Sequence, residues 1–372
     1  MIYFDNAATT FPKPKRVLKA VNDCIKSYCG NPGRSSHELS IKTSEKIYDA
    51  REKIAALVSA DEVENVVFTP SATFALNLAI KTSIPENGHV LISDIEHNSV
   101  LRPIHSLVKK RGISYSVFST DGDIEENIKR RITPKTTHIV SSIASNVFGR
   151  TIYPERLIDI AKKYKLKLII DSSQAIGHFK INLKGAESVV LCAPGHKALF
   201  GIQGVGFCIF CDSEKRESFI EGGTGGDSKS LSMPDYLPDR FEAGTLPSPA
   251  IISLGAGIDF INEIGIPEIE SKIKALSDRA YSVISSIKDC EVYEYGNGVV
   301  SFNLNGFTSE GLAYELNEFG ICTRGGFHCA PLAHRTFGTD KFGALRISFS
   351  YFNSEDEIDV LYKAIKSITK YK

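Results

Sequence analysis

Apolar and polar positions recur with two different periods along the middle of the chain. Short apolar runs rich in β-branched residues are separated by longer segments, such as residues 72–81 and 154–164, whose apolar positions recur at helical spacing. Segments of this length can form the crossover helices that connect parallel strands. The alternation predicts an α/β fold with a mostly parallel seven-stranded sheet and helices on both faces. The predicted strands are residues 63–69, 90–94, 113–119, 137–142, 166–171, 188–193 and 204–210.

The pattern changes after the last of these strands. Residues 221–249 are rich in Gly, Ser, Asp and Pro and predict an irregular connection, and residues 249–287 predict one long helical stretch. We therefore expect a large domain, residues 12–250, and a smaller C-terminal α+β domain formed by residues 1–11 and 251–372. The elements predicted in the smaller domain include strands over 298–304 and 344–349 and a last helix opened by a capping box at Ser354 and Glu357.

Composition narrows the class of protein. A chain of 372 residues with 42% hydrophobic content can bury a substantial core. Its 44 Lys and Arg balance its 44 Asp and Glu, so it lacks the positive charge of many nucleic-acid-binding proteins, and we expect a small-molecule ligand instead. No apolar run reaches the length of a membrane span, and the first residues lack the pattern of a signal peptide. The expectation is a cytoplasmic protein with no membrane or nucleic-acid partner.

The eight cysteines are too sparse for a disulfide scaffold, and in a reducing compartment they would remain thiols. Cys208 and Cys211 have the C-x-x-C spacing of some metal and redox sites. They fall in a predicted strand, where residues three apart point to opposite faces. This argues against a shared site, so no metal is predicted, and the pair remains an alternative.

Three polar residues follow two neighbouring predicted strands. Lys197 comes just after the strand 188–193, and Asp171 and Gln174 come at the end of the strand before it. Taken singly, they are most often a surface charge, a turn or a helix cap. Together, a lysine able to form a Schiff base and an acid able to keep a pyridine nitrogen protonated are what pyridoxal phosphate chemistry requires. The combination predicts a pyridoxal phosphate site.

A phosphate group needs donors, and the segment around Thr73 can supply them. Thr73 lies at the start of a helix that begins near Ala72, where free N–H groups and the helix dipole favour an anion. A simple N-cap explains this segment equally well. His97 follows the strand 90–94 and could place a flat ring at the same edge, although a lone histidine is more often structural.

Two residues near the C-terminus are candidates for a nucleophilic thiol and for a binding group of a substrate carboxylate. Cys329 lies beside His328 and near Arg324, and positive neighbours favour the nucleophilic thiolate, although a buried, inert cysteine is the usual case. Arg346 interrupts an apolar strand with a charge that needs a partner. A substrate carboxylate held in a bidentate manner would serve, and a structural salt bridge is the competing explanation.

These residues lie in motifs that resemble those of class V fold-type I pyridoxal phosphate enzymes, and more narrowly the cysteine desulfurases and selenocysteine lyases. The resemblance spans nearly the whole chain, and the segment around Cys329 is closest to group II of the desulfurases. It implies the fold-type I architecture, with a large domain built on the seven-stranded sheet and a smaller C-terminal domain. The motifs are residues 3–10 (YFDNAATT), 171–174 (DSSQ), 195–197 (GHK), 241–245 (FEAGT) and 324–330 (RGGFHCA).

The resemblance also implies a role for each candidate residue. Lys197 would bind pyridoxal phosphate and act with His97 and Cys329 as a catalytic residue, and Arg346 would bind the substrate carboxylate. Thr245 resembles the residue that reaches the phosphate from the neighbouring subunit, which implies a homodimer with shared active sites. Asp171 would contact the ring nitrogen of the cofactor, Gln174 its phenolic oxygen, and His97 would stack on the ring. Ala72, Thr73 and His196 would lie at the phosphate end of the cofactor, and Asn146 would lie near cofactor and substrate.

The activity that the resemblance implies is removal of sulfur from L-cysteine, which gives L-alanine and a persulfide on Cys329. A further protein could then accept the sulfur. L-selenocysteine is an alternative substrate, and a C–S β-lyase or an aminotransferase is an alternative reaction on the same cofactor. A non-enzymatic thiol or metal scaffold built on Cys208, Cys211, His328 and Cys329 is a third hypothesis.

Overall fold

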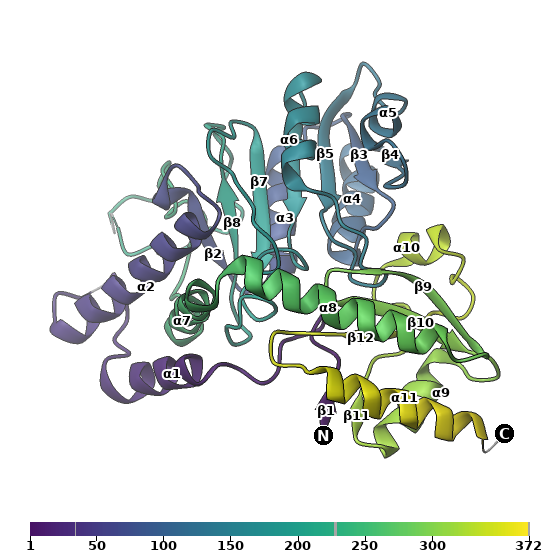
Figure 1. Cartoon of the computed structure of the whole chain (residues 1–372). Helices are drawn as coiled ribbons and strands as arrows, with labels where there is room; N and C mark the ends of the chain where they lie inside the picture. Colours follow the sequence, from purple (N-terminus) through teal and green to yellow (C-terminus); the bar gives the residue numbers. More distant parts are fainter. Residues whose placement is uncertain (34, 227–228, 371–372) are drawn as a thin grey trace.

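The computed structural model describes residues 1–33, 35–226 and 229–370 (Figure 1). Its larger part is built on a seven-stranded sheet in the order β2-β8-β7-β6-β5-β3-β4. Strand β8 is antiparallel to both of its neighbours, and the other pairs are parallel, so the predicted α/β fold with a mostly parallel sheet is confirmed. The strands are β2 (Val66–Thr69), β3 (His89–Ser93), β4 (Ser114–Phe118), β5 (Thr136–Ser142), β6 (Lys167–Asp171), β7 (Val189–Pro194) and β8 (Gly206–Phe210).

All seven strands expected in this region are present, with ends that differ from the prediction by at most three residues. The largest difference is at β2, because Val63–Asn65 form a short 3-10 turn before the strand begins. The short apolar runs locate strands well because the sheet buries both of its faces, and such strands are apolar at nearly every position.

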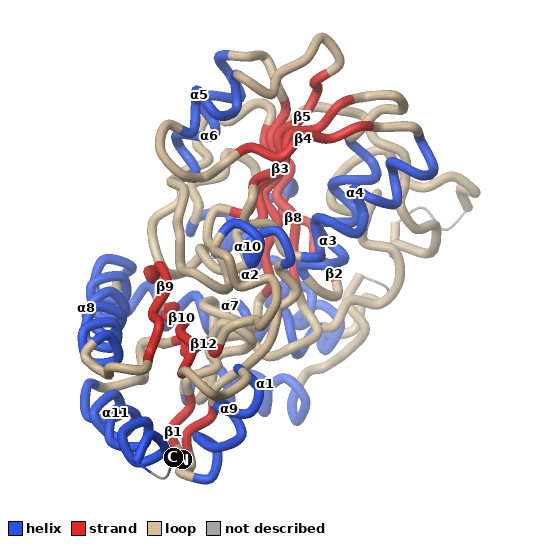
Figure 2. Tube along the Cα trace, turned by 90° about the vertical axis from the view of Figure 1, so that its right-hand side faces the viewer, coloured by secondary structure: helices blue, strands red, loops and turns tan. Residues whose placement is uncertain are grey.

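Alternate residues of the central strands face two separate cores. In β3, Val90 and Ile92 pack with the core under α3 and α4, whereas Leu91 packs with the core under α2, α6 and α7. Figure 2 shows α3 and α4 on one face of the sheet and α6 on the other. The helices of this part are α1 (Lys15–Ser27), α2 (Glu38–Leu57), α3 (Ala72–Ser83), α4 (Asn98–Arg111), α5 (Ile124–Lys129), α6 (Pro154–Lys163) and α7 (Ser248–Ile264).

The smaller part combines a three-stranded antiparallel sheet, in the order β12-β10-β9, with helices α8 and α11 (Figure 1). The N-terminal strand β1 joins this part, because it pairs in parallel with β11. Strand β1 and the last helix, α11, lie at the same end of the molecule in Figures 1 and 2. The elements are β1 (Ile2–Tyr3), α8 (Ile266–Ser285), β9 (Cys290–Gly296), β10 (Val299–Leu304), α9 (Ser309–Glu318), β11 (Ile321–Cys322), α10 (Pro331–Thr336), β12 (Leu345–Ser348) and α11 (Glu355–Lys370).

The prediction of one long helix over 249–287 is wrong. The segment forms two helices, α7 and α8, which bend by 83° at Gly265. Gly265 has φ 91°, which favours glycine, and Pro267 in the first turn of α8 has no N–H to continue the α7 ladder. In the described chain no single helix meets the length and apolarity of a membrane span, and α7 with α8 meets them only as a bent pair.

Helix α7 packs with the larger part of the molecule. Its residues Ile251, Leu254 and Ile258 are fully buried in the core that α2 and α6 share with the sheet. Helix α8 begins against the same core through Ile269 and continues into the smaller part. Helix α7 and the start of α8 therefore share the core of the larger part. The domain limits given above remain a prediction.

Candidate active site

A cavity opens at the carboxyl ends of the parallel strands, the edge at which open α/β sheets bind small molecules. The structure brings eight of the predicted site residues together in its wall, from five separate segments of the chain. The lining residues are Ser71, Ala72, Thr73, His97, Ser99, Ser142, Ala144, Asn146, Asp171, Ser173, Gln174, Pro194, His196 and Lys197.

Lys197 and Asp171 reach the cavity from the ends of β7 and β6, which are neighbouring strands. The pKa of Lys197 is lowered to about 8, mainly by burial and in smaller part by the charges of Arg346 and Arg324, while Asp171 acts in the opposite direction. Within the described residues the Lys197 ammonium has no hydrogen-bond or ion-pair partner. The Asp171 carboxylate accepts one hydrogen bond, from the Ser173 N–H at 2.9 Å. A neutral, unpartnered amine therefore becomes available close to neutral pH.

Gln174 and His97 are held by backbone contacts on either side of this pair. Gln174 Nε2 donates to the carbonyl oxygen of Ala7 at 2.9 Å, which ties the N-terminal segment to the cavity. His97 caps α4, since its Nδ1 accepts from the Ser99 N–H at 3.0 Å. Burial lowers the pKa of His97 to about 4, so its ring is neutral at physiological pH.

The other end of the cavity suits an anion. Ser71 caps α3 by accepting from the Phe74 N–H at 3.2 Å, so that Ala72 and Thr73 form the first turn of the helix. The Thr73 hydroxyl lies 2.8 Å from the Ser99 hydroxyl, and both side chains line the cavity. His196 contributes a neutral ring, because burial lowers its pKa to about 4. Free N–H groups, hydroxyls and the α3 dipole converge here as expected for a phosphate.

Cys329 lies outside this cavity, in an adjoining surface groove between α3 and α4. Cys329 is exposed, so the usual case of a buried, inert cysteine does not apply to it. The groove and the cavity share Thr73, His97 and Ser99 in their walls. The carbonyl oxygen of Cys329 accepts from the Asn98 N–H at 2.7 Å, directly after His97 in sequence. The thiol is thus exposed at the mouth of the predicted site.

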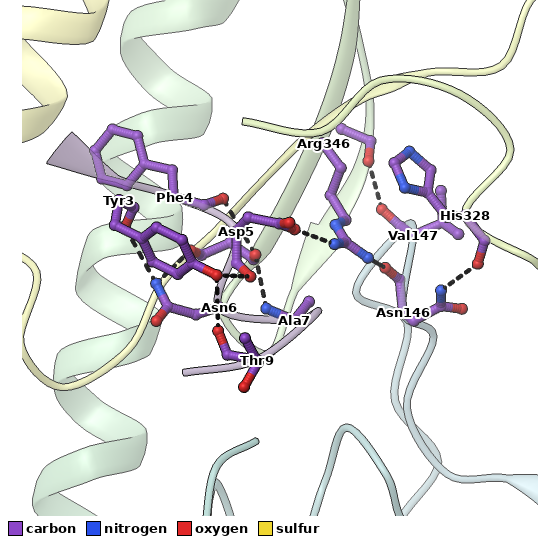
Figure 3. A network of polar contacts seen from close by, with 12 residues as sticks. Tyr3, Phe4, Asp5, Asn6, Ala7, Thr9, Asn146, Val147, His328 and Arg346 are labelled. Atoms are coloured by element: carbon purple, nitrogen blue, oxygen red, sulfur yellow. Dashed lines mark hydrogen bonds and ion pairs between the residues drawn. The ribbon is translucent and has the colours of Figure 1, made fainter. Parts of the chain in front are cut away.

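Arg346 is 1% exposed and pairs with Asp5, whose Oδ1 accepts from Nη2 at 2.5 Å (Figure 3). Its Nη1 donates to the carbonyl oxygen of Asn146 at 2.8 Å. The salt bridge considered from the sequence therefore exists. The Nε of Arg346 is buried without a hydrogen-bond partner in the described chain, which leaves one strong donor for a ligand. Carboxylate binding by Arg346 stays a prediction.

Thr245 is not part of the cavity wall of its own chain, and its side chain is exposed. The segment that carries it is held through Glu242, whose carboxylate accepts from both terminal nitrogens of Arg51. This placement leaves Thr245 free to contact something outside the chain, and its proposed contact with a partner subunit remains a prediction.

Cys208 pairs with Cys192 rather than with Cys211. Their sulfur atoms lie 3.8 Å apart on the neighbouring strands β7 and β8, and both residues are fully buried. Among the described residues, His, Cys, Asp and Glu side chains form no group of three or more that could hold a metal ion. The structure offers no support for the scaffold hypothesis.

Sequence reasoning left several cavity neighbours without a role. Glu96 is fully buried and accepts from the Ser142 N–H at 2.7 Å and the Ser142 hydroxyl at 2.9 Å. Burial raises its pKa to about 8. Asp5 also acts on the site, through its ion pair with Arg346. Arg324, which the sequence placed only near Cys329, also lowers the pKa of Lys197 and of His97 through its positive charge. The only sequence feature that could have identified Glu96 as a neighbour of the site is its position directly before His97.

The sheet topology and a lysine in a cavity at the strand ends define the fold-type I class. The chain belongs to the class-V aminotransferase family, whose model matches residues 2–361. A protein of Methanothermobacter thermautotrophicus named as a probable cysteine desulfurase is 31% identical, over 99% of this chain and 94% of its own length.

Further similarities agree with this family. A second probable cysteine desulfurase, from Halalkalibacterium halodurans, is 31% identical over 100% of this chain and 94% of its own length. The apo structure of a cysteine desulfurase from Thermococcus onnurineus superposes with a TM-score of 0.93 at 28% identity, covering 100% of this chain and 95% of that one. The fold-type I architecture predicted from the sequence is therefore confirmed.

Proposed function

We propose that the protein is a pyridoxal-phosphate-dependent cysteine desulfurase that converts L-cysteine into L-alanine and collects the sulfur as a persulfide on Cys329. One observation carries this proposal. The cavity that contains Lys197 and Asp171 shares part of its wall with the groove that exposes Cys329. An amine, an acid and an accessible thiol are therefore available to one substrate. The relatives that carry this activity in their names, over nearly the full chain, support the assignment.

The residues present fit pyridoxal phosphate. Lys197 is an unpartnered amine, Asp171 offers a carboxylate to the ring nitrogen, and the first turn of α3 with Thr73 and His196 offers donors to the phosphate. When bound, the cofactor supplies an electron sink for the bond electrons released at the substrate Cα. The imidazole of His97 is neutral, so it does not add a second positive charge beside the protonated pyridine ring of the cofactor.

The chain's own groups carry the remaining chemistry. Lys197, once free, accepts the Cα proton and returns it, because its lowered pKa keeps part of it neutral near pH 8. Arg346 Nε is available to hold the substrate carboxylate. The Cys329 thiolate attacks the substrate sulfur, so that an S–S bond forms and the C–S bond breaks. The electron pair of that bond stays on carbon and takes up a proton, and the products are alanine and the enzyme persulfide.

Intact-mass measurement tests the proposal. The cofactor-loaded protein, Cys329→Ser and the control Cys322→Ser are each exposed briefly to L-cysteine, with and without a reductant. We expect one or more added sulfur atoms on the unchanged protein and on Cys322→Ser, removed by reductant, and none on Cys329→Ser. Added sulfur on Cys329→Ser at the level of the unchanged protein would contradict the role of Cys329.

The products separate the alternative reactions on the same cofactor. Alanine with a persulfide indicates a desulfurase, and alanine formed only from L-selenocysteine indicates a selenocysteine lyase. Pyruvate with ammonia indicates a β-lyase, and an oxo acid with an aminated acceptor indicates an aminotransferase. A protein sulfur acceptor remains a prediction that requires the persulfide first.

We further propose a homodimer in which Thr245 of one subunit completes the site of the other. Its exposure and its absence from the cavity of its own chain support this arrangement. Mixed dimers of Lys197→Ala and Thr245→Val test it, since an arrangement across subunits restores one unchanged site in each mixed dimer. Activity in the mixture above that of both parents is expected. No gain would mean that Thr245 serves its own chain.

A further inference from the structure

Side-chain hydrogen bonds of Arg346, Asn146 and His328 connect the loop of Cys329 with the strand of Arg346, in addition to backbone hydrogen bonds between the two segments. Arg346 Nη1 donates to the carbonyl oxygen of Asn146, and Asn146 Nδ2 donates to the carbonyl oxygen of His328, both at 2.8 Å (Figure 3). His328 Nε2 lies 2.9 Å from the carbonyl oxygen of Ala344, two residues before Arg346. The backbone from Ala344 to Arg346 completes this circle of contacts. His328 is therefore tied to Arg346 along two independent routes.

These contacts determine the state of the His328 ring. A carbonyl oxygen can only accept, so Nε2 carries the hydrogen, and Nδ1 of the neutral ring is an acceptor. The side chain is 95% buried, and burial together with the charge of Arg346 lowers its pKa to about 2. His328 therefore acts here as a fixed neutral donor.

The backbone that carries the thiol depends on its contacts. His328 and Cys329 have φ values of +48° and +57°, a left-handed conformation that residues with side chains rarely adopt. Such a conformation persists only where the surroundings hold it. The supports are the two hydrogen bonds of His328 and the Asn98 N–H, which donates to the carbonyl oxygen of Cys329. A shift of Arg346 thus alters the support of the residue just before the nucleophile.

We propose that His328 is a positioning residue that couples the binding of a substrate carboxylate at Arg346 to the placement of the Cys329 thiol. The inference deepens the proposed function and rests on it, because it takes a carboxylate as the ligand of Arg346. Binding that moves the guanidinium moves Asn146 and Ala344 with it, and both of these hold His328. The thiol would then take up its attacking position only when a substrate is bound.

The alkylation rate of Cys329 measures this coupling without any turnover. The cofactor-loaded protein reacts with iodoacetamide in the presence and absence of saturating L-alanine, which carries the carboxylate but no sulfur. Peptide mass spectrometry separates the label on Cys329 from that on exposed Cys29. We expect L-alanine to change the Cys329 rate by at least about fivefold in the unchanged protein, a usual size for coupling between two sites.

Two variants of His328 isolate the hydrogen bond. His328→Leu keeps much of the buried volume without a donor, and we expect the effect of L-alanine to disappear. His328→Gln offers an amide N–H in place of Nε2, and we expect it to keep the effect. The matched control is His334→Leu. It removes the ring stacked on His328 at a centroid distance of 5.9 Å and leaves the His328 ring with its hydrogen bonds in place. This control should behave as the unchanged protein does.

Several outcomes would overturn the coupling. One is that L-alanine does not change the Cys329 alkylation rate of the unchanged protein. Another is that His328→Leu and His334→Leu lose the L-alanine effect equally, which would indicate that either substitution loosens the surrounding core. If His328→Leu does not fold by circular dichroism, loss of the effect in folded His328→Gln also refutes it. Failure of the proposed function is recognised separately, since a protein that forms no alanine from L-cysteine can still show the alkylation effect.

Discussion

Arg51 and Glu242, which are 191 positions apart, form a bidentate ion pair in the interior of the protein. Arg51 Nη1 lies 2.8 Å from Glu242 Oε1, Nη2 lies 2.9 Å from Oε2, and both side chains are at most 7% exposed. Glu242 Oε1 also accepts from the Phe68 N–H at 2.6 Å. Helix α2 and strand β2 therefore hold the segment that leads to Thr245.

Replacing Glu242 by Gln should destabilise the protein and loosen this segment. A buried arginine without its counter-charge costs about 3–5 kcal/mol of unfolding free energy. Urea unfolding measures the loss, and limited proteolysis reports cleavage within residues 221–247. The control Asp359→Asn breaks the exposed Arg279–Asp359 pair and should leave both measurements unchanged. Unaltered stability in Glu242→Gln would contradict an anchoring role.

Asp5→Asn should affect both stability and substrate binding. Arg346 is fully buried, and its charge is balanced in part by the partly exposed Asp5, so we expect a loss of about 3 kcal/mol in unfolding free energy. If Arg346 binds the substrate carboxylate as proposed, that carboxylate would become the main counter-charge of Arg346 once Asp5 is neutral. We therefore expect added L-alanine to raise the thermal midpoint more in Asp5→Asn than in the unchanged protein. Lys274 and Asp278, an exposed pair, provide the control Asp278→Asn. An equal L-alanine shift in both proteins would refute this balance of charge.

Gly257 allows α7 to approach the loop of Lys197. A Cβ at this position would lie 2.0 Å from the carbonyl oxygen of Leu199, two residues after Lys197. Gly257→Ala should therefore cost about 1–3 kcal/mol by overpacking and should weaken retention of pyridoxal phosphate during dialysis. Gly222→Ala, whose nearest contact is the Ala243 Cβ at 3.4 Å, is the matched control. Full cofactor retention in Gly257→Ala would show that the loop tolerates displacement.

The lowered pKa of Lys197 predicts pH-dependent labelling. Burial disfavours the ammonium form, so the neutral, reactive amine gains population as pH rises through about 8. Competitive acetylation of the cofactor-free protein, read by peptide mass spectrometry, should show Lys197 labelling increase through this range. Lys163, whose pKa is raised by its hydrogen bond with Glu125, should gain reactivity only at higher pH. Parallel profiles for the two lysines would contradict the burial effect.

The seven strands and the edge at which they end follow from local patterns in the sequence. Buried parallel strands are short, apolar and bounded by polar residues, and the residues after each strand collect at one edge by topology alone. For this reason Lys197, Asp171, Gln174, Thr73 and His97 could be placed at one edge before any tertiary contact was known, and the resemblance of the motifs added three more residues that line the same cavity. Their chemical roles remain predictions, because placement in a cavity does not show which atom each one contacts.

Only the tertiary structure decided which distant residues meet. The sequence identified Arg346 as a buried charge in need of a partner, but Asp5 lies 341 positions away and carries no local mark of that pairing. The turn at Gly265 between α7 and α8, the Cys192–Cys208 contact and the anchoring of Glu242 by Arg51 are likewise determined by packing. Local periodicity reports which face of an element is buried, whereas the partner across the core depends on how whole elements assemble.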